Sequence, residues 1–129
     1  AWSFAALGVC DYPLMPALAA QSIRRMREFG SQNLSNTAWA FAGLRFAHVP
    51  FLDAISAQSM RIIGQFDGQN LANTSWAFAK MAVTDMPLLA AMSSSAIRTI
   101  TELQAQEMSN IVWAYATLAV TDPPLSDAI

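Results

Sequence analysis

The stretch that decides the fold is Gln-Asn-Leu-Ala-Asn-Thr-Ser-Trp-Ala-Phe-Ala, at residues 69–79. A near-copy, Gln-Asn-Leu-Ser-Asn-Thr-Ala-Trp-Ala-Phe-Ala, lies 37 residues earlier at 32–42, and another, Gln-Glu-Met-Ser-Asn-Ile-Val-Trp-Ala-Tyr-Ala, lies 37 residues later at 106–116. A shorter copy, Trp-Ser-Phe-Ala, occupies residues 2–5. A constant step in this range indicates supersecondary units of one kind, stacked along the chain.

Other positions keep the same step of 37 residues. The aligned columns are Trp2, Trp39, Trp76 and Trp113; Asn36, Asn73 and Asn110; Gln32, Gln69 and Gln106; Arg24, Arg61 and Arg98; and Pro13, Pro50, Pro87 and Pro124. So many columns in register without a gap do not arise by chance, and the chain therefore repeats one structural unit.

Each unit has the pattern of two helices. The first is expected at 32–47 and 69–84, where apolar residues nearly encircle the helix, as in a helix that is buried on several sides. The second is expected at 50–66 and 87–103, where a Pro in the first turn is followed by an apolar stripe at helical spacing. We therefore predict an all-α fold, a right-handed α-solenoid (superhelix) of stacked two-helix repeats with a 37-residue period.

The residue two places before the Pro column is Asp in three copies and His in one. Asp11, Asp85 and Asp122 are expected to accept hydrogen bonds from first-turn amides. We expect His48, which takes the place of Asp, to be a solvent-exposed turn residue. Cys10 is expected to be a small, half-buried residue.

The domain organisation follows from the period. We predict one α-solenoid segment over residues 1–129, with a partial repeat at 1–31, full repeats at 32–68 and 69–105, and a partial repeat at 106–129. Solenoid ends normally carry polar caps, and neither end of this sequence does. The chain is therefore expected to belong to a longer array, or to associate with itself through its uncovered ends.

Composition excludes several classes of protein. Only 12% of the 129 residues are charged and 54% are hydrophobic, which excludes a disordered chain. A single Cys and a single His exclude a disulfide framework and a Cys- or His-rich metal site. No apolar run approaches the roughly 18–20 residues of a membrane span, so no membrane insertion is expected. No catalytic set or phosphate-binding loop is present, so we expect no enzyme activity, no cofactor and no metal.

Two ladders on the first helix have competing interpretations. The Trp residues could stack on bases, but packing in the core is the favoured interpretation. Asn36, Asn73 and Asn110 lie one turn before each Trp, where an amide could bridge neighbouring units or contact a base edge. The structural bridge is favoured, because an identical residue in each unit cannot discriminate between bases.

The Arg ladder has two interpretations of equal weight. Arg24, Arg61 and Arg98 could form a stripe that meets successive phosphates. Alternatively, they belong to an exposed helix face and pair with residues four places on, such as Glu28 and Glu102.

Base-specific contacts would require columns that vary between units. Three such columns lie on the first helix: Gly43, Lys80 and Thr117; Ala47, Thr84 and Thr121; and Asn33, Asn70 and Glu107. Base or partner recognition and neutral variation at exposed positions are both compatible with these columns.

The motif Leu/Met-x-Asn-x-x-Trp-Ala-aromatic-Ala, at 34–42, 71–79 and 108–116, resembles octotricopeptide repeats. It is also similar to the helical repeats that precede RAP domains in organellar RNA-binding proteins. This resemblance implies an α-solenoid that binds RNA in a chloroplast or mitochondrion.

The function favoured by these observations is a non-enzymatic, RNA-binding helical-repeat array that acts in organellar RNA processing, stability or translation. Its expected partner is single-stranded RNA. The candidate RNA-binding residues are Arg24, Arg61, Arg98, Lys80, Asn36, Asn73 and Asn110. The alternative is a protein–protein interaction scaffold or structural subunit of a larger complex, which a mildly acidic, Met-rich composition favours.

Overall fold

The structure is a computed structural model in which residues 14–44 and 48–121 are described. Within these ranges the chain has six α-helices, three short 3-10 turns and no strand. The elements, in order, are α2 (Leu14–Arg24), η1 (Met26–Glu28), α3 (Ser31–Gly43), α4 (Val49–Arg61), η2 (Ile63–Gln65), α5 (Gly68–Lys80), α6 (Met86–Arg98), η3 (Ile100–Glu102) and α7 (Ala105–Thr121). The predicted all-α class is therefore confirmed. Several residues on which predictions were made lie outside the described ranges: Trp2, Cys10, Asp11, Pro13, Ala47, Asp122 and Pro124.

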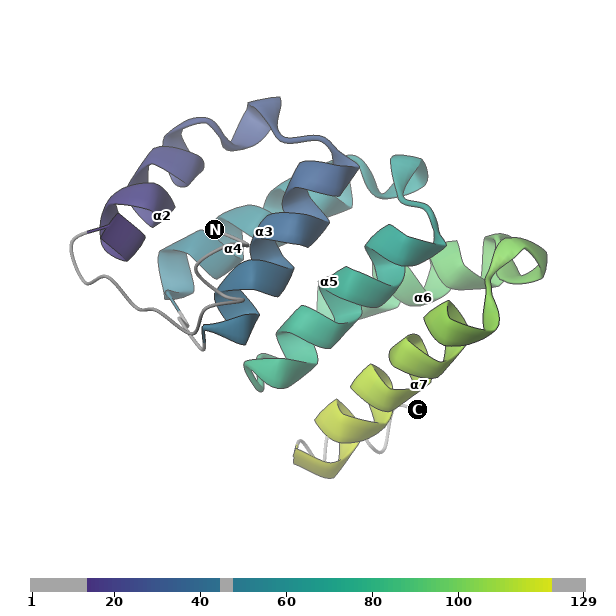
Figure 1. Cartoon of the computed structure of the whole chain (residues 1–129). Helices are drawn as coiled ribbons and strands as arrows, with labels where there is room; N and C mark the ends of the chain where they lie inside the picture. Colours follow the sequence, from purple (N-terminus) through teal and green to yellow (C-terminus); the bar gives the residue numbers. More distant parts are fainter. Residues whose placement is uncertain (1–13, 45–47, 122–129) are drawn as a thin grey trace.

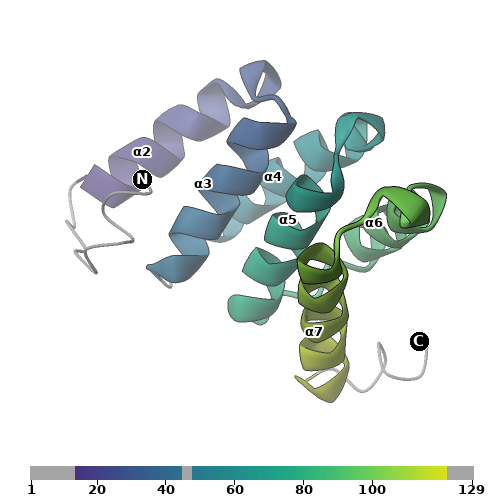
Figure 2. The same ribbon diagram turned by 45° about the vertical axis from the view of Figure 1, so that its right-hand side comes forward.

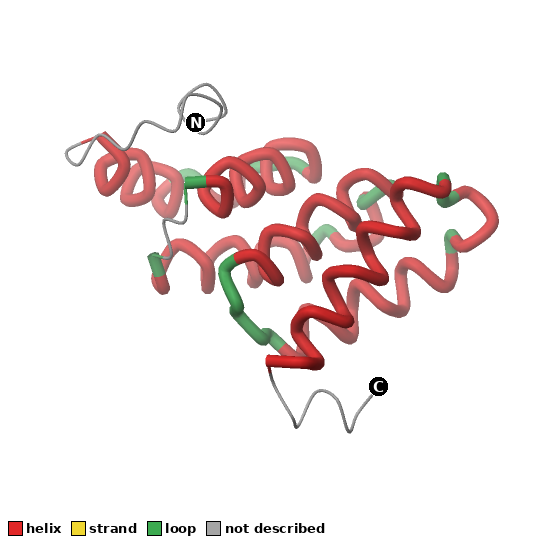
Figure 3. The backbone as a smooth tube through the Cα atoms, turned by 60° about the horizontal axis from the view of Figure 1, so that its bottom comes forward, coloured by secondary structure: helices red, strands yellow, loops and turns green. Residues whose placement is uncertain are grey.

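The helices lie in two rows (Figures 1 and 2). The front row in Figure 1 consists of α3, α5 and α7, which lie side by side, and α5 packs closely against both of its neighbours. The back row consists of α2, α4 and α6. Because the chain alternates between the rows, α3 with α4 and α5 with α6 form successive helical hairpins, which the tube in Figure 3 shows from another side.

The front-row helices begin with side-chain caps from a column that the sequence analysis considered for base recognition. Asn33 Oδ1 accepts a hydrogen bond from Gly30 N at 3.2 Å, and Glu107 Oε1 accepts one from Gln104 N at 2.9 Å. Asn70 and Asp67 cap α5 reciprocally, at 3.0 and 2.8 Å. The varying residue is thus the third residue of the helix, which returns a hydrogen bond to the N-cap amide. This capping role explains why the column is polar, and no contact with a nucleic-acid base is needed.

The back-row helices α4 and α6 are capped by the residue before their first turn. Asp85 Oδ1 accepts from Leu88 N at 3.1 Å, as predicted. His48 Nδ1 accepts from Phe51 N at 3.2 Å, so the prediction of a plain exposed turn residue is wrong. An imidazole nitrogen with a free lone pair can cap a helix in the place of a carboxylate.

The helices are shorter at their C-terminal ends than the periodicity predicts. The first helices were expected to reach 47 and 84, but α3 ends at Gly43 and α5 at Lys80. Ala82 has a left-handed φ of 56°, with Val83 N donating to Phe78 O and Ala82 N to Ala79 O, which is a Schellman C-cap. The apolar pattern continues past this turn, and for this reason periodicity predicts a C-terminus that is too late in the sequence.

The second helices were expected to reach 66 and 103. They end at Arg61 and Arg98, and the 3-10 turns η2 and η3 follow. Phe66, which directly follows η2, is buried against the core although it is not in the helix. The apolar stripe therefore extends beyond the α-helical hydrogen bonds.

The core lies between the two rows. Phe41 and Phe78 of the front row and Phe51 and Leu88 of the back row are fully buried, and the Phe41 and Phe51 ring centroids are 4.5 Å apart. Within the front row, buried Ala residues such as Ala77 allow the helices to approach closely. In the described part of the chain, no helix is both long and apolar enough to cross a membrane.

Candidate interaction surfaces

Four columns of the front row share one exposed side of each helix. Residues at spacings of four, three and four lie on one side of an α-helix, because each residue turns the helix by about 100°. On α5 these residues are Gln69, Asn73, Trp76 and Lys80. We call this side, over α3, α5 and α7, the amide–tryptophan face. It consists of Gln32, Gln69 and Gln106; Asn36, Asn73 and Asn110; Trp39, Trp76 and Trp113; and Gly43, Lys80 and Thr117.

A polar hollow of about 240 Å³ lies between the N-terminal halves of α3 and α5 on this face. Its lining residues are all polar: Ser31, Gln32, Asn36, Asp67, Gln69, Asn70 and Asn73. We call it the amide hollow. Four of its amide side chains make no hydrogen bond to any residue that the structure describes, and they are Gln32, Asn36, Gln69 and Asn73.

The predicted Asn bridges between units are absent from the described structure. Asn36 is exposed, and Asn73 and Asn110 are half-buried, without side-chain hydrogen bonds to described residues. The buried bridge between α5 and α3 comes from Asn70, whose Nδ2 donates to Ser35 Oγ at 3.2 Å. The bridging amide thus lies three residues earlier than expected, because Asn70 is on the side of α5 that faces α3.

The described Trp residues lie at the edge of the core rather than inside it. Trp76 packs against the core, so the predicted core packing of the Trp ladder is found only in part. Trp39 and Trp76 are half-buried, and Trp113 is 45% exposed. The core positions are instead taken by Phe41 and Phe78. Trp39 and Trp76 do contact each other across two units, with ring centroids 5.9 Å apart and planes tilted by 30°.

Lys80 brings a positive charge to this face. Its Nζ lies 5.8 Å from the centre of the Trp76 ring, within cation–π distance. Lys80 itself is exposed, so its ammonium group is accessible to a charged ligand.

The Arg ladder lies in the back row, on different helices from the amide–tryptophan face. Arg24, Arg61 and Arg98 are the exposed last residues of α2, α4 and α6. Within the described residues none of them forms an ion pair. Arg61 Nε donates to Gln58 Oε1 at 2.9 Å.

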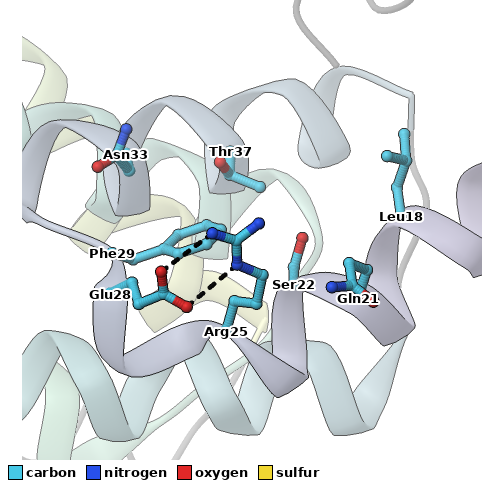
Figure 4. Close-up of a pocket in the computed structure, with 8 residues that line it drawn as sticks. All are labelled: Leu18, Gln21, Ser22, Arg25, Glu28, Phe29, Asn33 and Thr37. Carbon is cyan, nitrogen blue, oxygen red and sulfur yellow. Dashed lines mark hydrogen bonds and ion pairs between the residues drawn. The ribbon is translucent and has the colours of Figure 1, made fainter.

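Glu28 does not pair with Arg24 as one interpretation required. It pairs with Arg25 through two hydrogen bonds of 3.0 Å, which raise the pKa of Arg25 and lower the pKa of Glu28. Figure 4 shows this pair at a pocket of about 400 Å³ between α2 and α3, opposite Asn33 and Thr37. The spacing of three residues brings the two side chains together as well as a spacing of four would.

The side of α7 that points away from α5 is uncovered, unlike the same side of α5. Ala72 and Ala79 lie on the side of α5 opposite Asn70 and are buried. Their counterparts on α7, Ser109 and Ala116, are exposed. This side of α7 therefore repeats a surface that is buried between α5 and α7.

Apolar side chains extend this uncovered surface over α6 and α7. Val112 is 66% exposed and lies beside Trp113 in the sequence, and Ile97 of α6 is 68% exposed. Ser56 of α4 donates a hydrogen bond to Asp85 of the next hairpin. Its counterpart in α6, 37 residues later, is Ser93, and Ile97 lies one turn after Ser93 on the same side of α6. We call these residues the end face: Ile97, Ile100, Ser109, Val112, Trp113 and Ala116. Uncovered ends were predicted from the sequence, but these side chains were not. A comparison of burial identifies Ser109, Val112 and Ala116, because their counterparts on α5 are buried, whereas Met60, the counterpart of Ile97, is itself 41% exposed.

Residues 2–123 of the chain match the family of the RNA-editing substrate-binding complex 6 protein, RESC6. The chain belongs to the RESC6 family. A search of curated proteins finds no match to the chain. The RESC6 match includes every described residue of the amide–tryptophan face and of the end face.

Membership of the RESC6 family corrects the resemblance to octotricopeptide repeats. The motif that carried this resemblance, with its Asn, Trp and Ala positions, lies inside the RESC6 match. Buried Ala residues and an aromatic residue two places after Trp follow from close packing of neighbouring helices, so similar motifs can arise in different families of helical repeats. An organellar location, which was expected from the same resemblance, stays a prediction.

Proposed function

We propose that this RESC6-family chain is a non-enzymatic, helical-repeat subunit of an RNA-editing substrate-binding complex, in which it acts as a scaffold for RNA processing. The observation that carries this proposal is the family match over residues 2–123. The wider proposal of an α-solenoid is supported by the bounds of the helices. The front-row helices begin at 31, 68 and 105, and α4 and α6 begin at 49 and 86, at the 37-residue step of the sequence.

The scaffold role is supported by the end face. A surface that continues the α5–α7 packing is suited to a further helix with small residues at its point of contact, because such residues allow close approach. We propose that the end face binds a helical hairpin of another subunit. Burial of Val112, Ile97 and Trp113 would supply the apolar core of that interface.

In the part of the chain that the structure describes, no group of three or more His, Cys, Asp or Glu residues lies together as a metal site would require. The amide–tryptophan face carries one titratable group, the ammonium of Lys80. The hollow on this face adds the carboxylate of Asp67, which caps α5.

The test is reconstitution of the complex from purified subunits with a Val112→Asp variant. A charge at the centre of an apolar interface is desolvated without a partner, so recovery of the complex should fall about tenfold or more. Val49→Asp is the matched control, because Val49 is 65% exposed at the start of α4, away from the end face. Normal assembly of Val112→Asp, or equal loss with both variants, would contradict the proposed interface.

A further inference from the structure

The amide hollow has unused hydrogen-bonding capacity. Gln32, Asn36, Gln69 and Asn73 each carry a carbonyl oxygen and an NH₂ group, and these groups have no partner among the described residues. We propose that the amide–tryptophan face binds single-stranded RNA through its bases, with the edge of one base held in the amide hollow. This inference goes beyond the scaffold function, since it assigns direct RNA contact to a different surface of this chain, which shares only Trp113 with the end face.

The hollow has the chemistry of a site for a base edge. Side-chain amides form paired hydrogen bonds with the donor and acceptor groups of unpaired bases. Asp67 lines the same hollow, and its carboxylate disfavours a phosphate group there but can accept a hydrogen bond from a base amino group. The ligand of the hollow is therefore a neutral polar group, and the phosphates lie elsewhere on the face.

The neighbouring side chains supply the other contacts that a nucleotide chain needs. One turn beyond Asn73, the half-buried Trp76 contacts Trp39, and the exposed part of its indole is available for contact with a base. Lys80, one further turn along α5, lies against Trp76 and can meet a phosphate. The order of amide, indole and ammonium along one helix favours a polyanion with planar rings over a peptide.

The same columns continue onto α7, which predicts weak base selectivity. Gln106, Asn110 and Trp113 repeat the amide and indole positions, and Trp113 is more exposed than Trp76. Identical amides in each unit can bind bases but cannot distinguish among them according to position. We therefore expect single-stranded RNA of different sequences to bind with similar affinity.

The test is fluorescence anisotropy of the whole chain with a short, labelled single-stranded RNA of mixed sequence. The double variant Asn36→Ala/Asn73→Ala should weaken binding about tenfold or more, because two of the four amides of the hollow that lack a partner are removed. Lys80→Gln should reduce the slope of log affinity against log salt by about one. Gln65→Ala is the matched control for loss of an exposed amide, since Gln65 lies in η2, outside the hollow, and this variant should bind as the unmodified chain does.

Three results would overturn the inference. The first is absence of binding at low salt. The second is a double variant that binds as tightly as the unmodified chain and has an unchanged circular dichroism spectrum. The third is equal affinity for duplex RNA, whose base edges are already paired. Loss of binding only on replacing Arg24, Arg61 and Arg98 with Gln would also overturn it and would assign the RNA to the back row. Assembly of the complex by the double variant separates this test from that of the end face, because the amide hollow and the end face have no residue in common.

Discussion

Two asparagines three residues apart on α5 have different roles, although both belong to columns along the sequence. Asn70 is buried, caps its helix and bridges to Ser35, whereas the Asn73 amide has no partner among described residues. The repeat predicted that both positions matter. It could not predict which one bridges, because a one-dimensional period does not show which side of the helix faces the preceding unit.

Asp85 joins two hairpins at a single carboxylate. It caps α6 through Leu88 N and accepts a hydrogen bond from Ser56, which is buried on α4. We predict that Asp85→Ala lowers the free energy of unfolding by about 1–3 kcal/mol, because a cap is lost and a buried hydroxyl loses its acceptor.

Asp85→Asn is the matched control, since Asn keeps one oxygen to cap α6 and its NH₂ group can donate to Ser56 Oγ. Urea denaturation of the two variants measures the difference. Equal stability of Asp85→Ala and the unmodified protein would contradict this role.

Ala82 is strained by its left-handed backbone conformation, with a φ of 56° at the end of α5. Gly adopts this conformation without the steric penalty of a Cβ. We predict that Ala82→Gly raises the free energy of unfolding by about 0.5–1 kcal/mol, net of the greater backbone entropy of Gly in the unfolded chain.

The control for this substitution is Ala90→Gly, at an exposed position inside α6, which should destabilise by about 1 kcal/mol. Thermal melts of both variants would show shifts of opposite sign. A decrease in melting temperature for Ala82→Gly would contradict the strain at this residue.

At the scale of single elements, periodicity predicted where helices lie better than where they end. The N-termini of α4 and α6 are within one residue of their predicted starts, because Pro in the first turn marks them directly. The C-termini depend on a left-handed residue and on 3-10 turns, which leave the apolar pattern intact. Their positions therefore follow from backbone hydrogen bonds rather than from side-chain polarity.

Helix α7 is anchored by Tyr115, which takes the place of Phe41 and Phe78 in the other front-row helices. Its hydroxyl donates a hydrogen bond to Leu89 O, and burial raises the pKa of Tyr115 to about 12. In the unfolded chain a Tyr loses its proton near pH 10, so between pH 10 and 12 the unfolded state binds fewer protons than the folded state.

We predict that stability falls as the pH rises from 10 to 12, with a contribution from Tyr115 of about 1–2 kcal/mol after allowance for its partial exposure. Tyr115→Phe should be less stable at neutral pH, because the hydrogen bond is lost, but its stability should decline less at high pH. Chemical denaturation across this pH range compares the two proteins. Parallel pH profiles would contradict the assignment.

At the scale of the whole molecule, the sequence predicted the all-α class, and the structure shows successive hairpins in two rows (Figure 1). The half-buried position of the Trp ladder at the edge of the core was not predicted, since large apolar residues in a regular helical pattern usually pack inside the core. Here Phe41 and Phe78 fill that space, and the Trp rings lie on a face shared with the Gln and Asn columns.

The two candidate surfaces divide the molecule by function. The amide–tryptophan face crosses the front row, whereas the end face terminates both rows at α6 and α7. Trp113 belongs to both surfaces. We therefore predict that Trp113→Ala weakens both RNA binding and complex assembly. Asn73→Ala should weaken RNA binding alone, and Val112→Asp should weaken complex assembly alone. Anisotropy and reconstitution with the three variants test this division, and loss of only one activity in Trp113→Ala would contradict it.

Hydrogen exchange of α7, in the isolated chain and in the reconstituted complex, tests the scaffold function most directly. If a partner helix covers the end face, the backbone amides of residues 108–116 should exchange more slowly in the complex, while those of α5, already covered on both sides, should change little. Unchanged exchange across α7 in the assembled complex would contradict the account.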